Sequence, residues 1–186
     1  MRPSLAPPPP SAILDGPALR RDAARALATT ALLLGLVAGA LGASGFGADF
    51  VAKALAVYAV GCWRVWRGLA GCAHPHPRFG AANRITLGRL AGMATVAALL
   101  GEAVPAAPPS AAPVGGWVLI VAATLIAVLD AADGALARRQ GLASAFGARF
   151  DMETDAAFTL VLSALVWQAG QAGAWVLASG LMRYAF

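Results

Sequence analysis

Acidic residues gather in one polar stretch of an otherwise apolar chain. Residues 130–155 hold five of the nine Asp and Glu residues of the protein, and apolar segments lie on both sides of this stretch. Carboxylates are costly to keep at the edge of a membrane, so by default they mark a functional site. The five are Asp130, Asp133, Asp151, Glu153 and Asp155.

Helix geometry, at about 100° per residue, indicates which of these carboxylates can meet. On one helix, an arc of roughly 140° contains Asp130, Asp133, Gly134, Ala137 and Arg138. On a second helix beginning near Gly147, the residues at i, i+4 and i+8 are Gly147, Asp151 and Asp155. Glu153 falls on the far side of that helix. We therefore expect four aspartates from two helix ends to converge, without the glutamate.

Four neighbouring carboxylates repel one another too strongly to stay ionised alone. Mg²⁺ or Mn²⁺ resolves this conflict because both ions prefer oxygen ligands and often keep substrate phosphates in their coordination shell. Gly134 and Gly147 let a bulky ligand approach the backbone, and Arg138 supplies a fixed cation for a phosphate. The stretch therefore predicts a phosphate-handling site with a divalent metal.

The spacing of these residues resembles the signature of the CDP-alcohol phosphatidyltransferases. That signature is D-x-x-D-G-x-x-A-R, eight residues, then G-x-x-x-D-x-x-x-D. It is matched without a mismatch by Asp130, Asp133, Gly134, Ala137, Arg138, Gly147, Asp151 and Asp155. Upstream, an N-x-x-T-x-x-R pattern at Asn83, Thr86 and Arg89 spans about 120° of a helix and resembles the first core helix of the same family, which faces the active site.

The resemblance implies transfer of a substituted phosphate group from a CDP-linked donor, usually CDP-diacylglycerol, to an alcohol acceptor, with release of CMP. It implies that Asp130, Asp133 and Asp151 hold one or two Mg²⁺ or Mn²⁺ ions. Asp155 adds a ligand and is the family's candidate general base. The residues expected to bind the CDP moiety are Gly134, Ala137, Arg138, Gly147, Asn83, Thr86 and Arg89.

The acceptor alcohol is not identified by the sequence. Relatives that make phosphatidylglycerophosphate often have Pro and Lys where Met152 and Ala156 stand, which disfavours a phosphorylated acceptor of that kind. Arg139 and Arg149 either bind an acceptor phosphate or are simply positive charges on the inner side of the membrane.

The composition is that of a membrane protein. Hydrophobic residues make up 59% of the chain and charged residues 12%, a balance that argues against a soluble globule. The arginines flank apolar spans instead of lining a polar face, which argues against nucleic-acid binding. We predict an all-α fold, a polytopic membrane helix bundle with the active site at the cytoplasmic ends of the helices.

The chain divides into four predicted parts. We expect a disordered cytoplasmic tail over residues 1–23, two extra N-terminal membrane helices over 24–67, a cytoplasmic linker over 68–82 and the family core over 83–186. The apolar run 26–43 has a cleavable signal peptide as its competing interpretation. The family core has six membrane helices, and residues 83–186 show only four, so we expect a truncated core.

The distribution of cations predicts the topology. With the acidic motif in the cytoplasm and alternating spans, thirteen of the fourteen Lys and Arg residues lie on the inner side, and only Lys53 lies outside. We therefore expect a multi-pass protein of the inner cell membrane, with CDP-diacylglycerol or another CDP-alcohol, an alcohol acceptor and the lipid bilayer as partners. A homodimer is allowed.

Two other functions compete with this enzyme. One is a carboxylate-lined cation transporter, although such a protein needs acids deep within a span and these lie at span ends beside arginines. The other is a catalytically inactive membrane scaffold, which the two missing core helices suggest.

Overall fold

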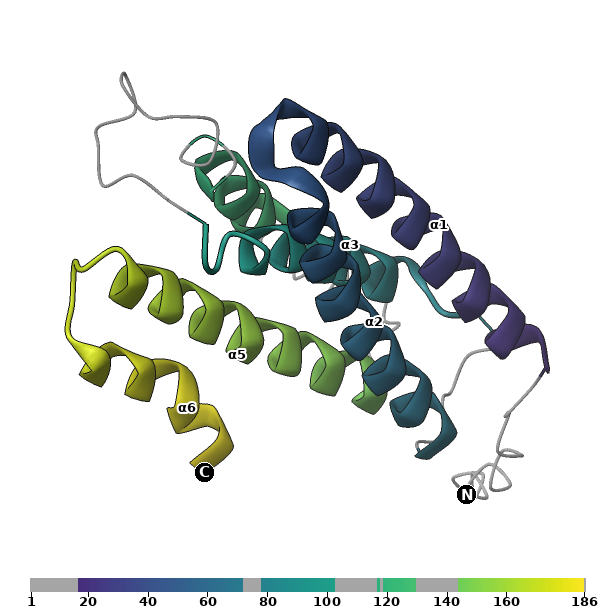
Figure 1. Cartoon of the computed structure of the whole chain (residues 1–186). Coiled ribbons are helices and arrows are strands. Elements are labelled where there is room, and N and C mark those ends of the chain that lie inside the picture. The colour runs from purple at the N-terminus through teal and green to yellow at the C-terminus, as the bar shows by residue number, and fades with distance from the viewer. Residues whose placement is uncertain (1–16, 72–77, 103–116, 118, 130–143, 186) are drawn as a thin grey trace, which may run out of the picture.

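The computed structural model describes residues 17–71, 78–102, 117, 119–129 and 144–185, and every regular element among them is a helix (Figure 1). The predicted all-α fold is confirmed for these residues. The elements are α1 (Pro17–Leu41), η1 (Gly42–Phe46), α2 (Gly47–Gly71), α3 (Ala81–Ala97), α5 (Ala145–Gln168), η3 (Ala174–Val176) and α6 (Leu177–Ala185). A further helical segment is Leu119–Leu129.

The first two helices form an antiparallel hairpin, in which the chain reverses at η1 (Figure 1). Gly45 and Gly47 adopt φ values of 132° and 80°, which favour glycine over any residue with a side chain. Tyr58 of α2 donates a hydrogen bond of 3.0 Å to the backbone oxygen of Leu27 in α1. The apolar stretch Pro17–Ala70, which includes both helices and the turn, has the length and hydropathy of a membrane-crossing segment.

The start of α1 corrects one predicted boundary. Residues 17–23 belong to the helix and not to a disordered tail, while residues 1–16 lie outside the described part of the chain. Pro17 suits the first helical turn because no intrahelical partner is needed for its missing N–H. Asp22, in the second turn, accepts hydrogen bonds from the backbone N–H of Phe79 at 3.0 Å and from Arg84 at 2.6 Å, so tertiary contacts hold the start of this helix.

The predicted linker is also shorter than expected. Residues 68–71 continue α2, and residues 81–82 begin α3. Leu69 is 4% exposed, so burial of this last apolar side chain carries α2 beyond the predicted end at residue 67.

Helix α3 is central and packs against α1, α2 and α5. It runs parallel to α1 and α5 and antiparallel to α2. The N-terminal ends of α1, α3 and α5 therefore gather at one end of the bundle, together with the C-terminal end of α2. We call this end the charged end, because the predicted site residues that the structure describes lie there.

Polar contacts fasten α3, α5 and α2 at the opposite end. The side chain of Gln168, the last residue of α5, accepts from the N–H of Gly101 at 2.7 Å and donates to the carbonyl of Glu102 at 2.8 Å. Lys53 of α2 donates to the Glu102 carboxylate at 2.6 Å and to the Leu100 carbonyl at 2.9 Å. We call this set of contacts the Gln168 clasp.

Candidate functional site

Helix α5 begins two residues before the predicted start at Gly147. Ser144 is its N-cap in an extended conformation, and the Ser144 hydroxyl accepts a hydrogen bond of 3.0 Å from the backbone N–H of Gly147. Such a cap satisfies one of the backbone donors left without a partner at a helix start. The capped helix then presents Asp151 and Asp155 one turn apart.

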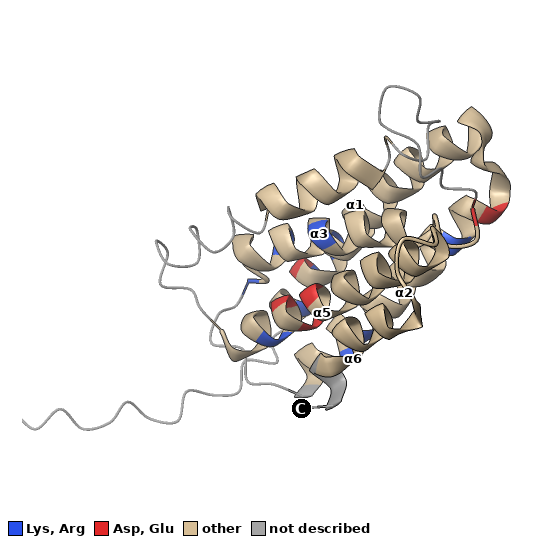
Figure 2. Ribbon diagram, turned by 90° about the vertical axis from the view of Figure 1, so that its left-hand side faces the viewer, with Lys and Arg blue, Asp and Glu red and all other residues tan. Residues whose placement is uncertain are grey.

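Both aspartates pair with one arginine of α3. Nη1 of Arg89 donates to Oδ1 of Asp151, and Nη2 donates to Oδ1 of Asp155. Figure 2 shows a basic (blue) band on α3 beside the acidic (red) bands of α5. The Arg89 side chain is 2% exposed, whereas the carboxylates are 37% and 49% exposed. A cation held between two carboxylates offsets their mutual repulsion, so Arg89 lets them stand together with one side open to a ligand.

The other residues of the N-x-x-T-x-x-R pattern lie on the same buried side of α3. Asn83 and Thr86 are 6% and 3% exposed. Asn83 donates through Nδ2 to the Phe79 carbonyl, and the Thr86 hydroxyl donates to the Ala82 carbonyl at 3.2 Å. Asn83 and Arg89 therefore meet the predicted site residues of α5, while Thr86 is buried on the same side of α3.

Gly147 allows α5 to approach Asn83 closely. A Cβ built on Gly147 would lie 2.8 Å from Oδ1 of Asn83, closer than real Cβ atoms approach, and a tight 3.1 Å from the Ser144 hydroxyl. The sequence predicted that Gly147 makes room for a ligand. In this structure the space beside it is taken by Asn83.

Glu153 points to the other face of α5, as helix geometry predicted. One carboxylate oxygen accepts from Nη2 of Arg64 in α2 at 2.9 Å, and the other accepts from Nε of Arg149 at 3.3 Å. In the predicted topology, Arg64 is one of the thirteen cations on the inner side of the membrane. No local signal connects it with Glu153, because 89 positions separate them.

The first half of the acidic motif lies outside the described residues. That half comprises Asp130, Asp133, Gly134, Ala137 and Arg138. Leu129, which directly precedes Asp130, lies beside Gly88, next to Arg89 in the sequence. The convergence of all four aspartates stays a prediction.

The described residues contain no group of three or more His, Cys, Asp or Glu side chains that could hold a metal ion. Asp151 and Asp155 nevertheless supply two partly exposed carboxylates on successive turns. Hard oxygen donors of this kind fit Mg²⁺ or Mn²⁺, so the described half of the donor set suits the predicted ions.

Comparison with known proteins identifies one family. The family model described as CDP-alcohol phosphatidyltransferase matches residues 79–186, more than half of the chain. This span includes α3, the helical segment Leu119–Leu129, α5 and α6, and it excludes α1 and α2. No curated protein and no solved structure matches the chain.

Proposed function

Because the chain belongs to the CDP-alcohol phosphatidyltransferase family, whose members transfer phosphate from a CDP-alcohol to an alcohol acceptor, we propose that it uses CDP-diacylglycerol in phospholipid biosynthesis. One observation carries this proposal. Inside the matched region, Asp151 and Asp155 converge on Arg89 at the charged end of α3 and α5. Family membership supplies the reaction class, and the paired carboxylates supply the groups that it needs.

The reaction is a displacement at phosphorus. The acceptor loses its hydroxyl proton, a bond forms between its oxygen and the phosphorus of the diacylglycerol-bearing phosphate, and the bond to the CMP oxygen breaks. CMP leaves with the electron pair of that bond. Asp155, at 49% exposure, is the proposed base that takes the proton.

The proposed ligands of Mg²⁺ or Mn²⁺ are Asp130, Asp133 and Asp151, with Asp155 as a further ligand. Bound there, such an ion would neutralise charge on the pyrophosphate. Arg89 fixes the spacing of Asp151 and Asp155, because each carboxylate accepts from a different nitrogen of one rigid guanidinium. The proposed binding residues for CDP are Gly134, Ala137, Arg138, Gly147, Asn83, Thr86 and Arg89.

We also propose that the helices cross the membrane with the charged end in the cytoplasm. Support comes from large apolar side chains that face outward from α1, with Leu32, Leu33 and Leu36 between 57% and 64% exposed. A helix from the core of a soluble protein would bury such residues, whereas lipid accommodates them. The asymmetry of the cations supports the orientation.

The test is CMP release from CDP-diacylglycerol by the full-length protein, measured across a panel of alcohols with Mn²⁺ present. We expect the unmodified protein to release CMP with one class of alcohol, and the Asp155→Asn variant to lose this activity. A folded protein that releases no CMP with any alcohol would instead support the inactive scaffold.

A further inference from the structure

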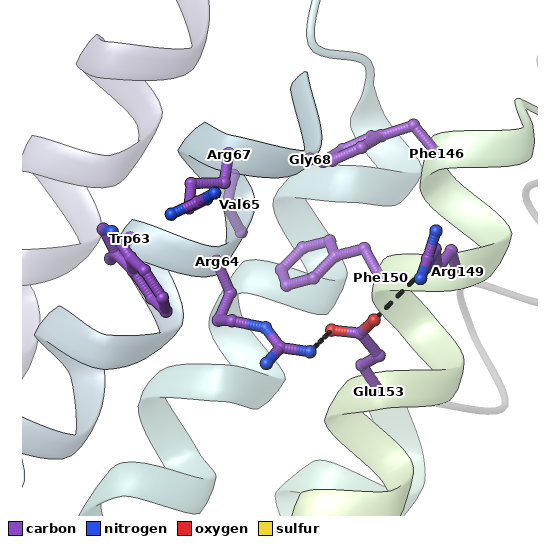
Figure 3. Close-up of a pocket in the computed structure, with 9 residues that line it drawn as sticks. All are labelled: Trp63, Arg64, Val65, Arg67, Gly68, Phe146, Arg149, Phe150 and Glu153. Carbon is purple, nitrogen blue, oxygen red and sulfur yellow. Dashed lines mark hydrogen bonds and ion pairs between the residues drawn. The ribbon is translucent and has the colours of Figure 1, made fainter. Parts of the chain in front are cut away.

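A pocket of about 310 Å³ lies between α2 and the first turns of α5, on the side of α5 that carries Glu153 (Figure 3). We call it the arginine pocket, because Arg64 and Arg67 of α2 and Arg149 of α5 all line it. Among the described residues that line it, Glu153 is the only acidic one, so the described lining carries an excess of positive charge. A group that fills this pocket is therefore expected to be an anion.

The contacts with Glu153 orient Arg64 and Arg149 without occupying all of their N–H donors. Figure 3 shows Arg64 and Arg149 reaching the Glu153 carboxylate from opposite sides, at 2.9 Å and 3.3 Å. Each guanidinium has five N–H donors, and each described contact with Glu153 uses one of them. Their side chains are 55% and 72% exposed. The geometry therefore leaves donors for the oxygens of a phosphate, the anion that guanidinium groups recognise best.

Aromatic rings also line the pocket. The guanidinium carbon of Arg67 lies 5.2 Å from the centre of the Trp63 ring, in a cation–π arrangement. Phe146 packs against Gly68, where a Cβ would lie 2.9 Å from the ring. Tryptophan and arginine together are typical of the level of lipid headgroups.

An apolar groove continues from the arginine pocket. It has a volume of about 640 Å³, runs between α2, α3 and α5, and shares with the pocket the residues Trp63, Arg64, Phe150 and Glu153. Its far end is at Lys53, which precedes Arg64 by eleven residues in α2. That separation is about 16 Å along a helix. The groove is therefore an elongated apolar space that begins at the arginine pocket.

We propose that an anionic phospholipid binds here, with its phosphate in the arginine pocket and an acyl chain in the apolar groove. The proposal rests on the membrane placement given above and goes beyond the transfer reaction. The lipid is separate from the CDP-linked donor, because Glu153 faces away from Asp151 and Asp155. The site also depends on this chain's N-terminal hairpin, because α2 forms one of its walls and lies outside the residues that match the family.

A second apolar groove of about 520 Å³ provides an internal control. It lies between α1, α3 and Leu119–Leu129, and no charged residue is among the described residues that line it. Among the described residues, cations therefore line the first groove and not the second. The described lining thus favours an anionic headgroup only at the first groove.

The test is lipid binding to the full-length protein in zwitterionic detergent, measured by native mass spectrometry without any CDP-linked donor. The probes are phosphatidylglycerol and phosphatidylcholine with identical acyl chains, and inorganic phosphate is the competitor. We expect phosphatidylglycerol to bind roughly fivefold or more tightly than phosphatidylcholine. Arg67→Gln and Arg149→Gln, both at exposed positions, should each weaken phosphatidylglycerol binding roughly fivefold.

Filling each groove separates headgroup from chain. Ala157→Phe, in the apolar groove, should weaken binding of both lipids, whereas Ala122→Phe, in the second groove, should leave the headgroup preference unchanged. Equal binding of the two lipids, or no effect of Arg67→Gln, would overturn the proposal. Complete displacement by inorganic phosphate with no effect of Ala157→Phe would also overturn it, in favour of a soluble phosphate ligand.

The outcome is independent of catalysis. If lipid selectivity is present and CMP release is absent, the lipid site stands and the proposed reaction fails. If CMP is released and both lipids bind equally, the reaction stands and the lipid site fails.

Discussion

On both faces of α5 carboxylates pair with arginine, but the arginines of the two faces differ in burial. On the aspartate face, Arg89 is 2% exposed and contacts Asp151 and Asp155. On the glutamate face, Arg64 is 55% exposed and Arg149 is 72% exposed, and both contact Glu153. A buried guanidinium is costly to desolvate and is held by its partners, whereas an exposed one is free to reorient. The aspartate face thus suits chemistry that needs fixed geometry, and the glutamate face suits reversible binding.

Removal of divalent metal should have the largest effect, and it should affect only the function proposed for the aspartate face. We expect EDTA to abolish CMP release, and Mg²⁺ or Mn²⁺ to restore it, because only the aspartate face is proposed to bind the ion. Lipid selectivity at the glutamate face should survive EDTA. Full CMP release in chelator would rule out a metal role for the aspartates.

Loss of the proposed base should have the next largest effect. Asp155→Asn should reduce turnover by about 10²–10⁴-fold and leave measurable binding of the CDP donor, because the other aspartates remain. Glu153→Gln, two residues away on the opposite face, should cost far less, and the exposed Asp49→Asn serves as a control in α2. Turnover and donor binding are measured separately. Equal damage by Glu153→Gln and Asp155→Asn would contradict the assignment of roles to the two faces.

Replacing one arginine on each face should lower the free energy of unfolding by different amounts, because the two arginines differ in burial. Arg89→Ala should lower the free energy of unfolding by about 3 kcal/mol, because it leaves two carboxylates facing each other without their cation. Arg64→Ala should cost about 1 kcal/mol or less, as exposed pairs do. Thermal unfolding in detergent measures both.

Metal addition tests the same pair of variants further. Mn²⁺ should stabilise the Arg89→Ala protein more than the parent, because the ion replaces the lost positive charge. If Mn²⁺ raises the unfolding temperature of Arg64→Ala by as much as that of Arg89→Ala, the ion does not bind at the aspartate face.

The smallest expected effect concerns the packing of the aspartate face. Gly147→Ala should destabilise the protein by about 1–2 kcal/mol, because the new methyl group would overlap Oδ1 of Asn83, whose amide is tied to Phe79. Gly39→Ala in α1 is the matched control, with nothing within 4 Å of the added Cβ. It should stabilise the helix by about 1 kcal/mol. Unfolding of both variants is compared under identical conditions, and a stabilising Gly147→Ala would contradict the close approach of α5 to Asn83.

Sequence alone was sufficient wherever one helix decides the geometry. The spacing of Asp151 and Asp155, and the opposite direction of Glu153, follow from 3.6 residues per turn. The all-helical fold follows from long apolar segments. The N-x-x-T-x-x-R pattern also indicated a shared side of α3, and its three residues are buried together.

Contacts between distant segments could not be predicted in the same way. Arg89 meets Asp151 across 62 positions, and Arg64 meets Glu153 across 89. The early start of α1 depends on Asp22 reaching the N–H of Phe79, 57 positions away. Such pairings depend on how helices cross and pack, which hydropathy and local spacing do not determine.

The Gln168 clasp fastens α5 at the end that lies far from its aspartates. It fastens α5 to the turn that follows α3, while Asp151 stands seventeen residues away at the other end, about 26 Å along the helix. With the clasp as pivot, a tilt of only about two degrees displaces the aspartate carboxylates by roughly 1 Å. A misplacement of about 1 Å can cost a reaction about 10²-fold in rate. The contacts of the Gln168 amide at the far end of the helix therefore bear on the geometry of the reaction proposed for the charged end.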